Sequence, residues 1–241
     1  MNAPRMLTAA SAVVAMLAAI MSLAAPAHAD TTAHQVTPGM SIYQDLDGGT
    51  MRDTCTASYL VRDRTTGRVE MLTSGHCVRS DAASGLYYVN ASDGREFALG
   101  SFIRHEYVLD SDGNTALDAA LFTVNSNLPA TGKIGNQYLL DQPIAYAPLA
   151  ANFVGKKACK FGSKTGSGCG TITEVTKNTV TVSGPLVIEG DSGSPVYYVN
   201  QDGTASPIGI LSNGNGTSSH TFRAVLIDPI LDKWNLSLIA N

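Results

Sequence analysis

Short stretches of β-branched and aromatic residues recur along most of this 241-residue chain, and polar turns separate them. Residues 56–61 form one such stretch, a polar turn follows at 62–67, and apolar residues resume at 69–72, which is the pattern of a β-hairpin. Comparable stretches occupy residues 86–89, 96–103, 119–124, 179–183, 195–199, 208–211 and 221–227. Asp-Gly pairs at 93–94 and 112–113 favour tight turns between strands. The pattern predicts an all-β protein.

A different pattern begins at Asp228. This residue can cap a helix, and Pro229 suits the first helical position. Apolar residues then recur at helical spacing, at Ile230, Leu231, Trp234 and Leu238. We therefore expect a C-terminal helix. Residues 136–150 contain two prolines and no clean alternation, which indicates a link between two β units.

The N-terminal region has the features of a secretory signal peptide. Arg5 supplies a positive charge, and residues 6–25 are small and apolar with a few Ser and Thr. The sequence Ala27-His28-Ala29 then provides a cleavage site, so we expect a secreted protein that begins near Asp30. The competing interpretation is an uncleaved membrane anchor, since the apolar run is about long enough to span a bilayer. No second apolar stretch has that length.

Composition narrows the possible functions. Charged residues make up 15% of the chain, the net charge is −4 and no basic run occurs, so nucleic acid is not an expected partner. Four cysteines in a secreted chain imply two disulfides, for which three pairings are possible. A metal site is the alternative, but no Cys-x-x-Cys occurs and no histidine lies at ligand spacing.

The candidate chemistry centres on Ser192, in the sequence Gly-Asp-Ser-Gly between two apolar runs. A serine hydroxyl is a weak nucleophile at neutral pH, so it needs a base, and the base needs an orienting acid. His76, beside Cys77, and Asp118, before an apolar run, can fill these roles. Each residue alone also fits a structural role: a turn serine, a buried histidine beside a cysteine, or a hairpin aspartate.

Together, the order His76, Asp118, Ser192 and the surrounding sequences resemble the chymotrypsin-like serine protease family, in its compact secreted bacterial branch (alpha-lytic and streptogrisin-like). The segment CKFGSKTGSGCGTIT, residues 159–173, is similar to the disulfide-closed loop of alpha-lytic-type proteases. The resemblance implies two six-stranded antiparallel β-barrels packed face to face, with a C-terminal helix. The expected divisions are a signal peptide at 1–29, a short lead at 30–50, a first barrel at 51–140 with His76 and Asp118, and a second barrel at 141–241 with Ser192.

The resemblance also implies pairings and roles. The expected disulfides are Cys55–Cys77 and Cys159–Cys169. His76 is expected to take the Ser192 proton during attack on a peptide carbonyl, while Asp118 fixes the tautomer of His76. The backbone N–H groups of Gly190 and Ser192 are expected to form the oxyanion hole. The resemblance implies a monomeric endopeptidase that acts on protein or peptide substrates, with no metal and no cofactor.

Two features depart from the family pattern. Bacterial relatives commonly place an arginine just after the first cysteine of the second-barrel loop, where it pairs with the aspartate before the serine. Lys160 stands at that position here, so we expect a Lys160–Asp191 ion pair, although lysine lacks the bidentate fork of arginine. The alternative is a solvated surface lysine. The lead at 30–50 is also too short for a folding pro-domain.

Substrate preference is expected to come from the pocket walls. Ser212, Asn213 and Gly214 match the segment that pairs with the substrate backbone, although a plain turn has the same composition. Leu186 stands six residues before Ser192, where trypsin-like members have an acid, so we expect an apolar rather than a basic residue before the scissile bond (P1).

Two further residues bear on substrate preference. His220 could line the pocket and bind an acidic P1 side chain, or it could be a surface histidine in a loop. Glu189 is expected at the rim of the cleft, where it would disfavour acidic substrates.

Two other functions compete with a protease. The first is a secreted binding module that keeps the fold without catalysis. The second is an α/β-hydrolase esterase, but that fold needs Gly-x-Ser-x-Gly, and Ser194 occupies the position of the last glycine. Its triad order would leave only Asp202 and His220 as partners of Ser192, and the chain lacks alternating helices.

Overall fold

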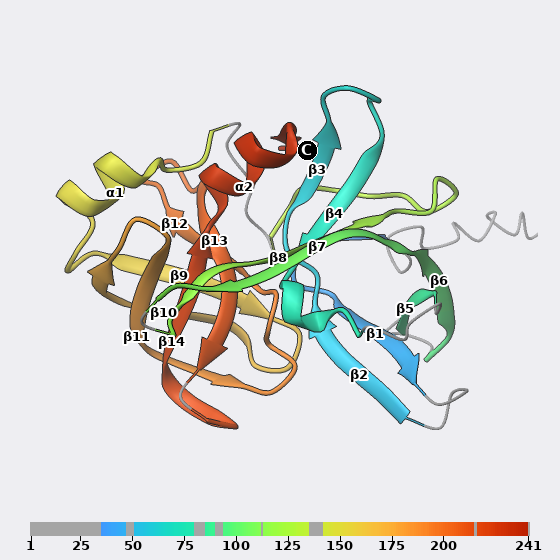
Figure 1. The fold of residues 1–241 in the computed structure, drawn as a ribbon, viewed down its shortest axis with the longest axis horizontal. Coiled ribbons are helices and arrows are strands. Elements are labelled where there is room, and N and C mark those ends of the chain that lie inside the picture. The colour runs from blue at the N-terminus through green and yellow to red at the C-terminus, as the bar shows by residue number, and fades with distance from the viewer. Residues whose placement is uncertain are drawn as a thin grey trace, which may run out of the picture. The chain divides into compact units, whose positions relative to one another are not determined.

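A computed structural model describes residues 35–46, 51–79, 85–89, 94–111, 113–134, 142–214 and 216–240 (Figure 1). The predicted signal peptide at 1–29, its cleavage site and the start of the lead lie outside the described residues. Within the described part of the chain, no helix has the length and apolar character needed to cross a membrane.

The first half of the chain forms two antiparallel sheets. Four strands pair in the order β2-β1-β5-β6: β1 (Ser41–Leu46), β2 (Met51–Thr56), β5 (Leu86–Val89) and β6 (Glu96–Gly100). Five strands pair in the order β15-β3-β4-β8-β7: β3 (Leu60–Asp63), β4 (Val69–Thr73), β7 (Phe102–Leu109), β8 (Thr115–Thr123) and β15 (Leu236–Leu238). Backbone hydrogen bonds from Thr123 N to Ser101 O (3.0 Å) and from Asn125 N to Leu99 O (2.7 Å) join the two sheets along one side.

Strand β4 shows why both faces of the larger sheet are apolar. Side chains alternate along a strand, so Met71 points into the core between the two sheets, with Leu99 and Phe122. Leu72 points the other way, into a second core that the two halves of the chain share with helix α2 (Ile227–Trp234). The sequence of β4 is accordingly a nearly continuous buried run rather than an alternating one.

The second half forms a closed six-stranded barrel in the order β10-β11-β14-β13-β12-β9. Its strands are β9 (Lys157–Gly162), β10 (Gly166–Val175), β11 (Thr179–Ile188), β12 (Pro195–Val199), β13 (Ala205–Gly214) and β14 (Ser218–Leu226). Helix α1 (Tyr146–Asn152) precedes the barrel and α2 follows it. The predicted all-β fold of two packed barrels with a C-terminal helix is confirmed. The first barrel is built from four- and five-stranded sheets rather than from one closed six-stranded sheet.

The boundaries differ from the predicted ones at both ends. Strand β1 lies inside the segment 30–50 that was predicted to be a lead. It belongs to the first barrel, because it pairs with β2, with Ser41 opposite Thr56. Strand β15 lies in the predicted second barrel but pairs with β3 of the first, with Leu236 opposite Asp63. The chain therefore returns to the first barrel after completing the second.

The helices also differ from expectation. Helix α2 has Leu226 as its N-cap, without a side-chain hydrogen bond, so Asp228 lies in the first turn and is not the cap. Ile230, Leu231 and Trp234 are buried as expected, whereas Leu238 belongs to strand β15. Helix α1 begins in the segment 136–150, which was predicted to be a plain link, and extends beyond it to Asn152.

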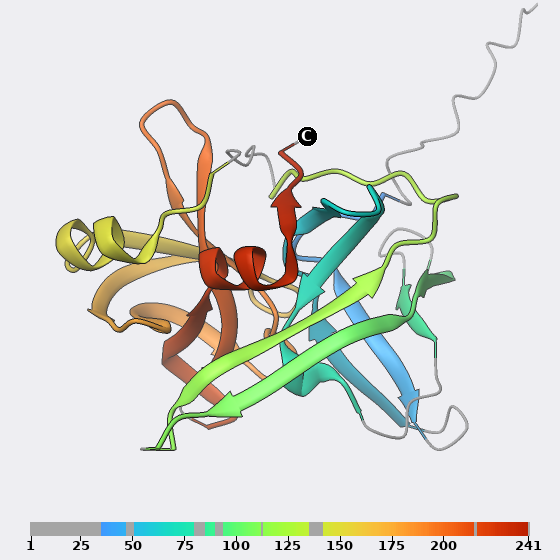
Figure 2. The ribbon, with the colours of Figure 1, turned by 45° about the horizontal axis from the view of Figure 1, so that its top comes forward.

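One hairpin connects the two barrels beside the site described below. Figure 2 shows β7 and β8 as a long ribbon that extends from the first barrel toward the second. At its tip, Arg223 Nη1 of β14 donates to Asn114 Oδ1 at 3.2 Å, and Asn213 Nδ2 of β13 lies 3.4 Å from Thr115 Oγ1. Strand β8 carries Asp118 and β13 carries Ser212 and Asn213, so these contacts help to fix the two strands relative to each other.

Candidate active site

His76 lies on a 3₁₀ turn, Gly75–Cys77, that directly follows β4. A disulfide joins Cys77 to Cys55 at the end of β2, so this turn is covalently tied to the neighbouring sheet. The His76 side chain is 34% exposed, which leaves part of the imidazole open to solvent. The second disulfide joins Cys159 to Cys169 between the paired strands β9 and β10, and both pairings agree with the prediction.

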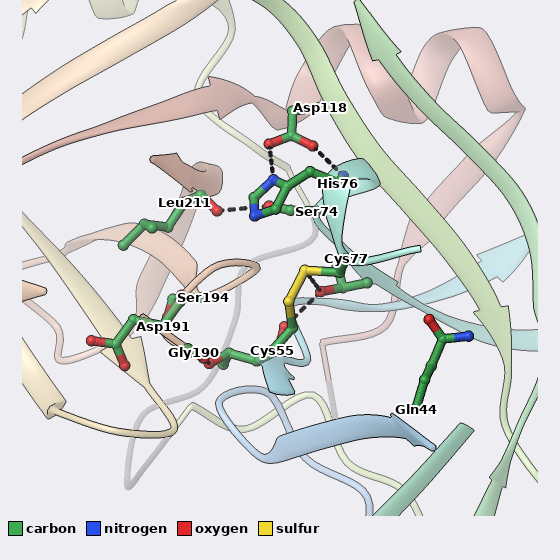
Figure 3. Close-up of a disulfide and its surroundings, with 12 residues drawn as sticks. Gln44, Cys55, Ser74, His76, Cys77, Asp118, Gly190, Asp191, Ser194 and Leu211 are labelled. Carbon is green, nitrogen blue, oxygen red and sulfur yellow. Dashed lines mark hydrogen bonds and ion pairs between the residues drawn. A yellow bond between two sulfur atoms is a disulfide. The ribbon is translucent and has the colours of Figure 1, made fainter. Parts of the chain in front are cut away.

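Asp118 on β8 is completely buried and faces His76. Its Oδ2 lies 2.7 Å from His76 Nδ1, and its Oδ1 accepts the His76 backbone N–H at 2.9 Å (Figure 3). Ser212 of the second barrel donates from Oγ to the same Oδ2 at 2.6 Å. A carboxylate can only accept, so Nδ1 is the protonated ring nitrogen and Nε2 is the nitrogen available as a base.

Ser192 lies in the serine loop, which we define as residues 189–194 between β11 and β12. Ser192 and His76 both line a pocket of about 430 Å³. The loop packs closely against the first barrel: a Cβ added at Gly193, whose φ is +90°, would lie 2.1 Å from the Thr56 carbonyl oxygen. A glycine is therefore required here both by conformation and by the close approach of the backbone.

The backbone N–H groups of the serine loop fall into two sets. Four have acceptors: Glu189 N donates to Thr217 O at 3.3 Å, Asp191 N to Ile188 O at 3.0 Å, Gly193 N to Leu211 O at 2.8 Å and Ser194 N to Asp191 O at 3.0 Å. In contrast, the N–H groups of Gly190 and Ser192 have no acceptor among the described residues. Unpaired N–H groups in a tightly packed loop are uncommon, so this pair is available to an external oxygen atom. Gly190 has φ +94°, which favours glycine at this position.

The Asp191 carboxylate is buried below the loop and fully hydrogen-bonded. Oδ1 accepts the N–H groups of Lys164 (3.0 Å) and Thr165 (3.2 Å), and Oδ2 accepts the Thr165 hydroxyl at 2.6 Å and the Ile188 N–H at 3.2 Å. Lys160 Nζ lies 3.8 Å from Oδ2, and neither side chain is exposed. The geometry is that of a buried ion pair and not of a surface lysine.

Lys160 has other partners besides Asp191. Its ammonium donates to the Thr165 hydroxyl and, at 2.8 Å, to the Gly166 carbonyl. Burial lowers the pKa of Lys160, and the nearby Asp191 carboxylate opposes that shift because it favours the charged form. Thr165 thus bridges the two charges from within the loop closed by the Cys159–Cys169 disulfide.

The walls of the pocket differ in part from the prediction. Ser212, Asn213 and Gly214 line it as expected, and Glu189 lies at its edge. Leu186 does not line it and is 42% exposed. The next two residues of β11, Val187 and Ile188, line the pocket instead, so counting back from Ser192 selected a position just before the lining segment. The residues that replace it in the lining are Val187, Ile188, Leu211, Gly216 and Thr217.

Other residues near the site were not singled out from the sequence. The Tyr107 ring of β7 packs edge-on at 6.1 Å from the His76 ring and is 52% exposed. Tyr107 stands opposite Asp118 in the β7–β8 register, but nothing in its local sequence indicates that pairing. His220 is exposed, contacts the Gly184 carbonyl at 3.0 Å and does not line the pocket.

One cluster within the described residues gathers three potential metal ligands, namely Cys55, His76 and Cys77. Both sulfur atoms are bonded to each other, so neither is available as a thiolate. In this cluster only the imidazole could bind a metal ion, and one ligand does not make a protein metal site.

Solved structures with the same arrangement of strands are bacterial serine proteases. A Nocardiopsis protease is 24% identical, with a TM-score of 0.59 over 85% of this chain and 99% of that one. A glutamic-acid-specific serine protease is 19% identical (TM-score 0.61; 84% and 100% covered), and the chymotrypsin of Cellulomonas bogoriensis is 21% identical (TM-score 0.58; 86% and 100% covered). The chain therefore has the chymotrypsin-like fold of secreted bacterial serine proteases.

Sequence relatives define a narrower group. No protein-family model matches the chain. The uncharacterized protein MT1863 of Mycobacterium tuberculosis (strain CDC 1551 / Oshkosh) is 30% identical over 209 residues, which cover 84% of this chain and 83% of the relative. The uncharacterized protein Rv1815 of strain ATCC 25618 / H37Rv is 29% identical over the same shares. The chain belongs to one family with these mycobacterial proteins.

Proposed function

We propose that this protein is a secreted serine endopeptidase that hydrolyses peptide bonds through His76, Asp118 and Ser192. The observation that carries the proposal is the pair of unpaired N–H groups, those of Gly190 and Ser192, in the loop that also presents the serine hydroxyl to the pocket. A binding module has no need to leave these two donors unsatisfied, whereas an acyl-transfer site needs them for the oxyanion.

In the proposed reaction, Ser192 Oγ attacks the substrate carbonyl carbon and its proton passes to His76 Nε2. Asp118, held by Ser212, keeps the Nδ1 proton in place and stabilises the imidazolium. The N–H groups of Gly190 and Ser192 stabilise the oxyanion. The imidazolium then protonates the departing amine, and a water molecule hydrolyses the acyl-enzyme by the reverse sequence. Apart from the substrate and the water molecule, every group in these steps belongs to the protein chain.

We infer a preference for an apolar P1 side chain, on the basis of lining residues other than Leu186. Val187, Ile188 and Leu211 provide apolar walls, and a buried cation to bind an acidic side chain is not among the residues that line the pocket. The Glu189 carboxylate at the edge would repel an acidic substrate. We propose action on proteins or peptides as a secreted monomer after cleavage near Ala29, in agreement with two disulfides.

The first test is labelling of the mature protein with a fluorophosphonate probe. Wild type should be labelled, and Ser192→Ala should not, because the phosphorus is attacked by the Ser192 hydroxyl. For an amide substrate we expect both Ser192→Ala and His76→Ala to lower kcat by on the order of 10⁴- to 10⁶-fold, since the triad acts as a unit. His220→Ala is the matched control and should keep wild-type activity, because that exposed histidine lies outside the pocket.

A well-folded wild-type protein that is not labelled would reject the proposal and favour the non-catalytic binding module. Circular dichroism and an unfolding transition of each variant show whether a loss of labelling reflects chemistry or misfolding. Loss of activity in His220→Ala but not in His76→Ala would contradict the proposed base.

A further inference from the structure

We propose that Thr56 is a positioning residue that fixes the serine loop and, with it, the orientation of the unpaired Gly190 N–H. The inference rests on the proposed function for its catalytic consequence. Thr56 is the last residue of β2 in the first barrel, next to Cys55, and it is completely buried. Figure 3 shows the disulfide of Cys55 with His76 and Asp118 on one side and Gly190 on the other.

Thr56 holds the serine loop at two points. Its backbone N–H donates to the Ser192 carbonyl at 2.7 Å, and its hydroxyl Oγ1 donates to the Gly190 carbonyl at 2.8 Å. The two bonds lie on either side of Asp191. One residue of the first barrel therefore fixes the stretch of the second barrel that carries both the nucleophile and the proposed oxyanion donors.

Ser163, in the turn between β9 and β10, orients the Thr56 hydroxyl. The Ser163 backbone N–H donates to Thr56 Oγ1 at 3.1 Å, and Ser163 Oγ lies 2.9 Å from Thr56 Oγ1 and 3.2 Å from the Gly190 carbonyl oxygen. A hydroxyl has a single proton to donate. The Thr56 proton has two acceptors within reach, Ser163 Oγ at 2.9 Å and the Gly190 carbonyl oxygen at 2.8 Å, and in our proposal it bonds the carbonyl.

The Gly190 carbonyl matters because of the residue that carries it. Glycine at φ +94° has no Cβ to restrict it, so its own N–H could change orientation at little cost. The peptide plane between Gly190 and Asp191 is held at both ends. Thr56 donates to its carbonyl oxygen, that of Gly190, and its N–H, that of Asp191, donates to Ile188 O. With that plane fixed, the N–H of Gly190 has far less freedom to rotate. Oxyanion donors are effective only when held in place before the reaction.

Thr56 itself is held rigidly. Thr73 of β4 donates from Oγ1 to the Thr56 carbonyl at 2.8 Å, and the adjacent disulfide joins Cys55 to the turn that carries His76. The base and the oxyanion donors are thus connected through Thr56 and Cys55. A shift of either barrel would be transmitted to both.

The experiment compares hydroxyl and shape at this position in the mature protein. Thr56→Val keeps the shape and removes the hydroxyl, whereas Thr56→Ser keeps the hydroxyl. On an amide substrate that the wild type hydrolyses, we expect Thr56→Val to lower kcat by about tenfold to a hundredfold and to change KM by less than about twofold. This decrease in kcat is smaller than the one expected when a direct oxyanion donor is removed. Thr56→Ser should stay within about threefold of wild type. Hydrogen–deuterium exchange of residues 188–194 should become faster in Thr56→Val alone.

Thr179→Val is the matched control, because Thr179 is also a buried threonine whose hydroxyl bonds another threonine, Thr176, away from the pocket. It should change neither kcat nor the exchange of residues 188–194. If Thr56→Val fails to fold, Thr56→Ala takes its place, since Thr56→Ala and Thr56→Ser both lack the methyl group and differ in the hydroxyl.

Three outcomes overturn the inference: wild-type kcat and exchange in Thr56→Val, equal losses in Thr56→Val and Thr56→Ser, or a loss expressed in KM alone. Failure of the proposed function is a separate result. A wild-type protein that neither reacts with the fluorophosphonate nor hydrolyses a substrate would reject the endopeptidase, and the exchange of residues 188–194 would then decide alone whether the Thr56 hydroxyl holds the loop.

Discussion

Two buried charged sites, Lys160–Asp191 in the second barrel and Glu70 in the first, differ in how their charges are accommodated. In the second barrel, Lys160 and Asp191 face each other in a network in which each charged group has further hydrogen bonds. In the first barrel, Glu70 of β4 is completely buried, yet neither carboxylate oxygen has a hydrogen-bond partner among the described residues. Its ion-pair partner there is the exposed Arg68, whose Nη2 lies 3.4 Å from Oε1.

The difference separates a buried charge that organises a loop from one that only costs stability. The Asp191 network ties together the turn at Lys164 and Thr165, the end of β11 and the serine loop, so removing one member disturbs all three. Glu70 ties together nothing beyond its own strand. Burial raises its pKa, since the charged form is poorly solvated.

The largest expected effect on stability comes from removing the cation of the Lys160–Asp191 pair. Lys160→Met leaves the Asp191 charge buried without its cation, so we expect the free energy of unfolding to fall by about 3 kcal/mol. Activity should fall as well, because Asp191 precedes Ser192 in the loop. Urea unfolding and amidase assays measure the two effects. Lys157→Met, at an exposed lysine on the same strand, is the control. Full activity in a Lys160→Ala protein would contradict a role for the pair.

A smaller effect, of opposite sign, is expected at Glu70. Glu70→Gln removes the buried charge, so we expect a gain of about 1 kcal/mol at pH 8. The pKa of Glu70 is raised from its ordinary value of 4.5, so its contribution to stability is present below that value and is lost as pH rises through the higher folded pKa. The gain in Glu70→Gln should therefore vanish near pH 4. Urea unfolding across pH 4 to 8 tests this, and a gain independent of pH would contradict it.

The smallest effect on stability is expected at Glu106, a partly exposed glutamate in the same sheet as Glu70. Glu106 of β7 accepts hydrogen bonds from the Lys233 ammonium and, at 3.1 Å, from Trp234 Nε1 of α2. The hydrogen bond from Lys233 lowers the pKa of Glu106. Its contribution is present above the ordinary value of 4.5 and is lost as pH falls through the lower folded pKa.

Glu106→Gln should therefore cost about 0.5 kcal/mol at pH 7, since the Glu106 and Lys233 side chains are partly exposed, and nothing in acid. The same unfolding series measures it. A cost that grows as pH falls would show that the ion pair does not stabilise α2 against the sheet.

Local sequence patterns predicted much of this structure, and contacts between distant segments account for the rest. The hairpins, the buried residues of α2 and, through the resemblance, both disulfides follow from residues close in the chain or from a known motif. The hydrogen bond of Thr56 to Gly190 joins residues 134 positions apart, and nothing in either local sequence indicates it. Leu186 was misplaced for another reason: the count from Ser192 does not fix where β11 meets the pocket, which begins at Val187.

Strand β15 has a consequence for how the protein is made. The first barrel's five-stranded sheet has β15 at its edge, and β15 follows the whole second barrel in the sequence. On the ribosome, β3 has no partner on that side until residues 236–238 have emerged. The half that carries His76 and Asp118 is synthesised first but completed last, so the sheet that holds these two residues is finished only after translation of the second barrel.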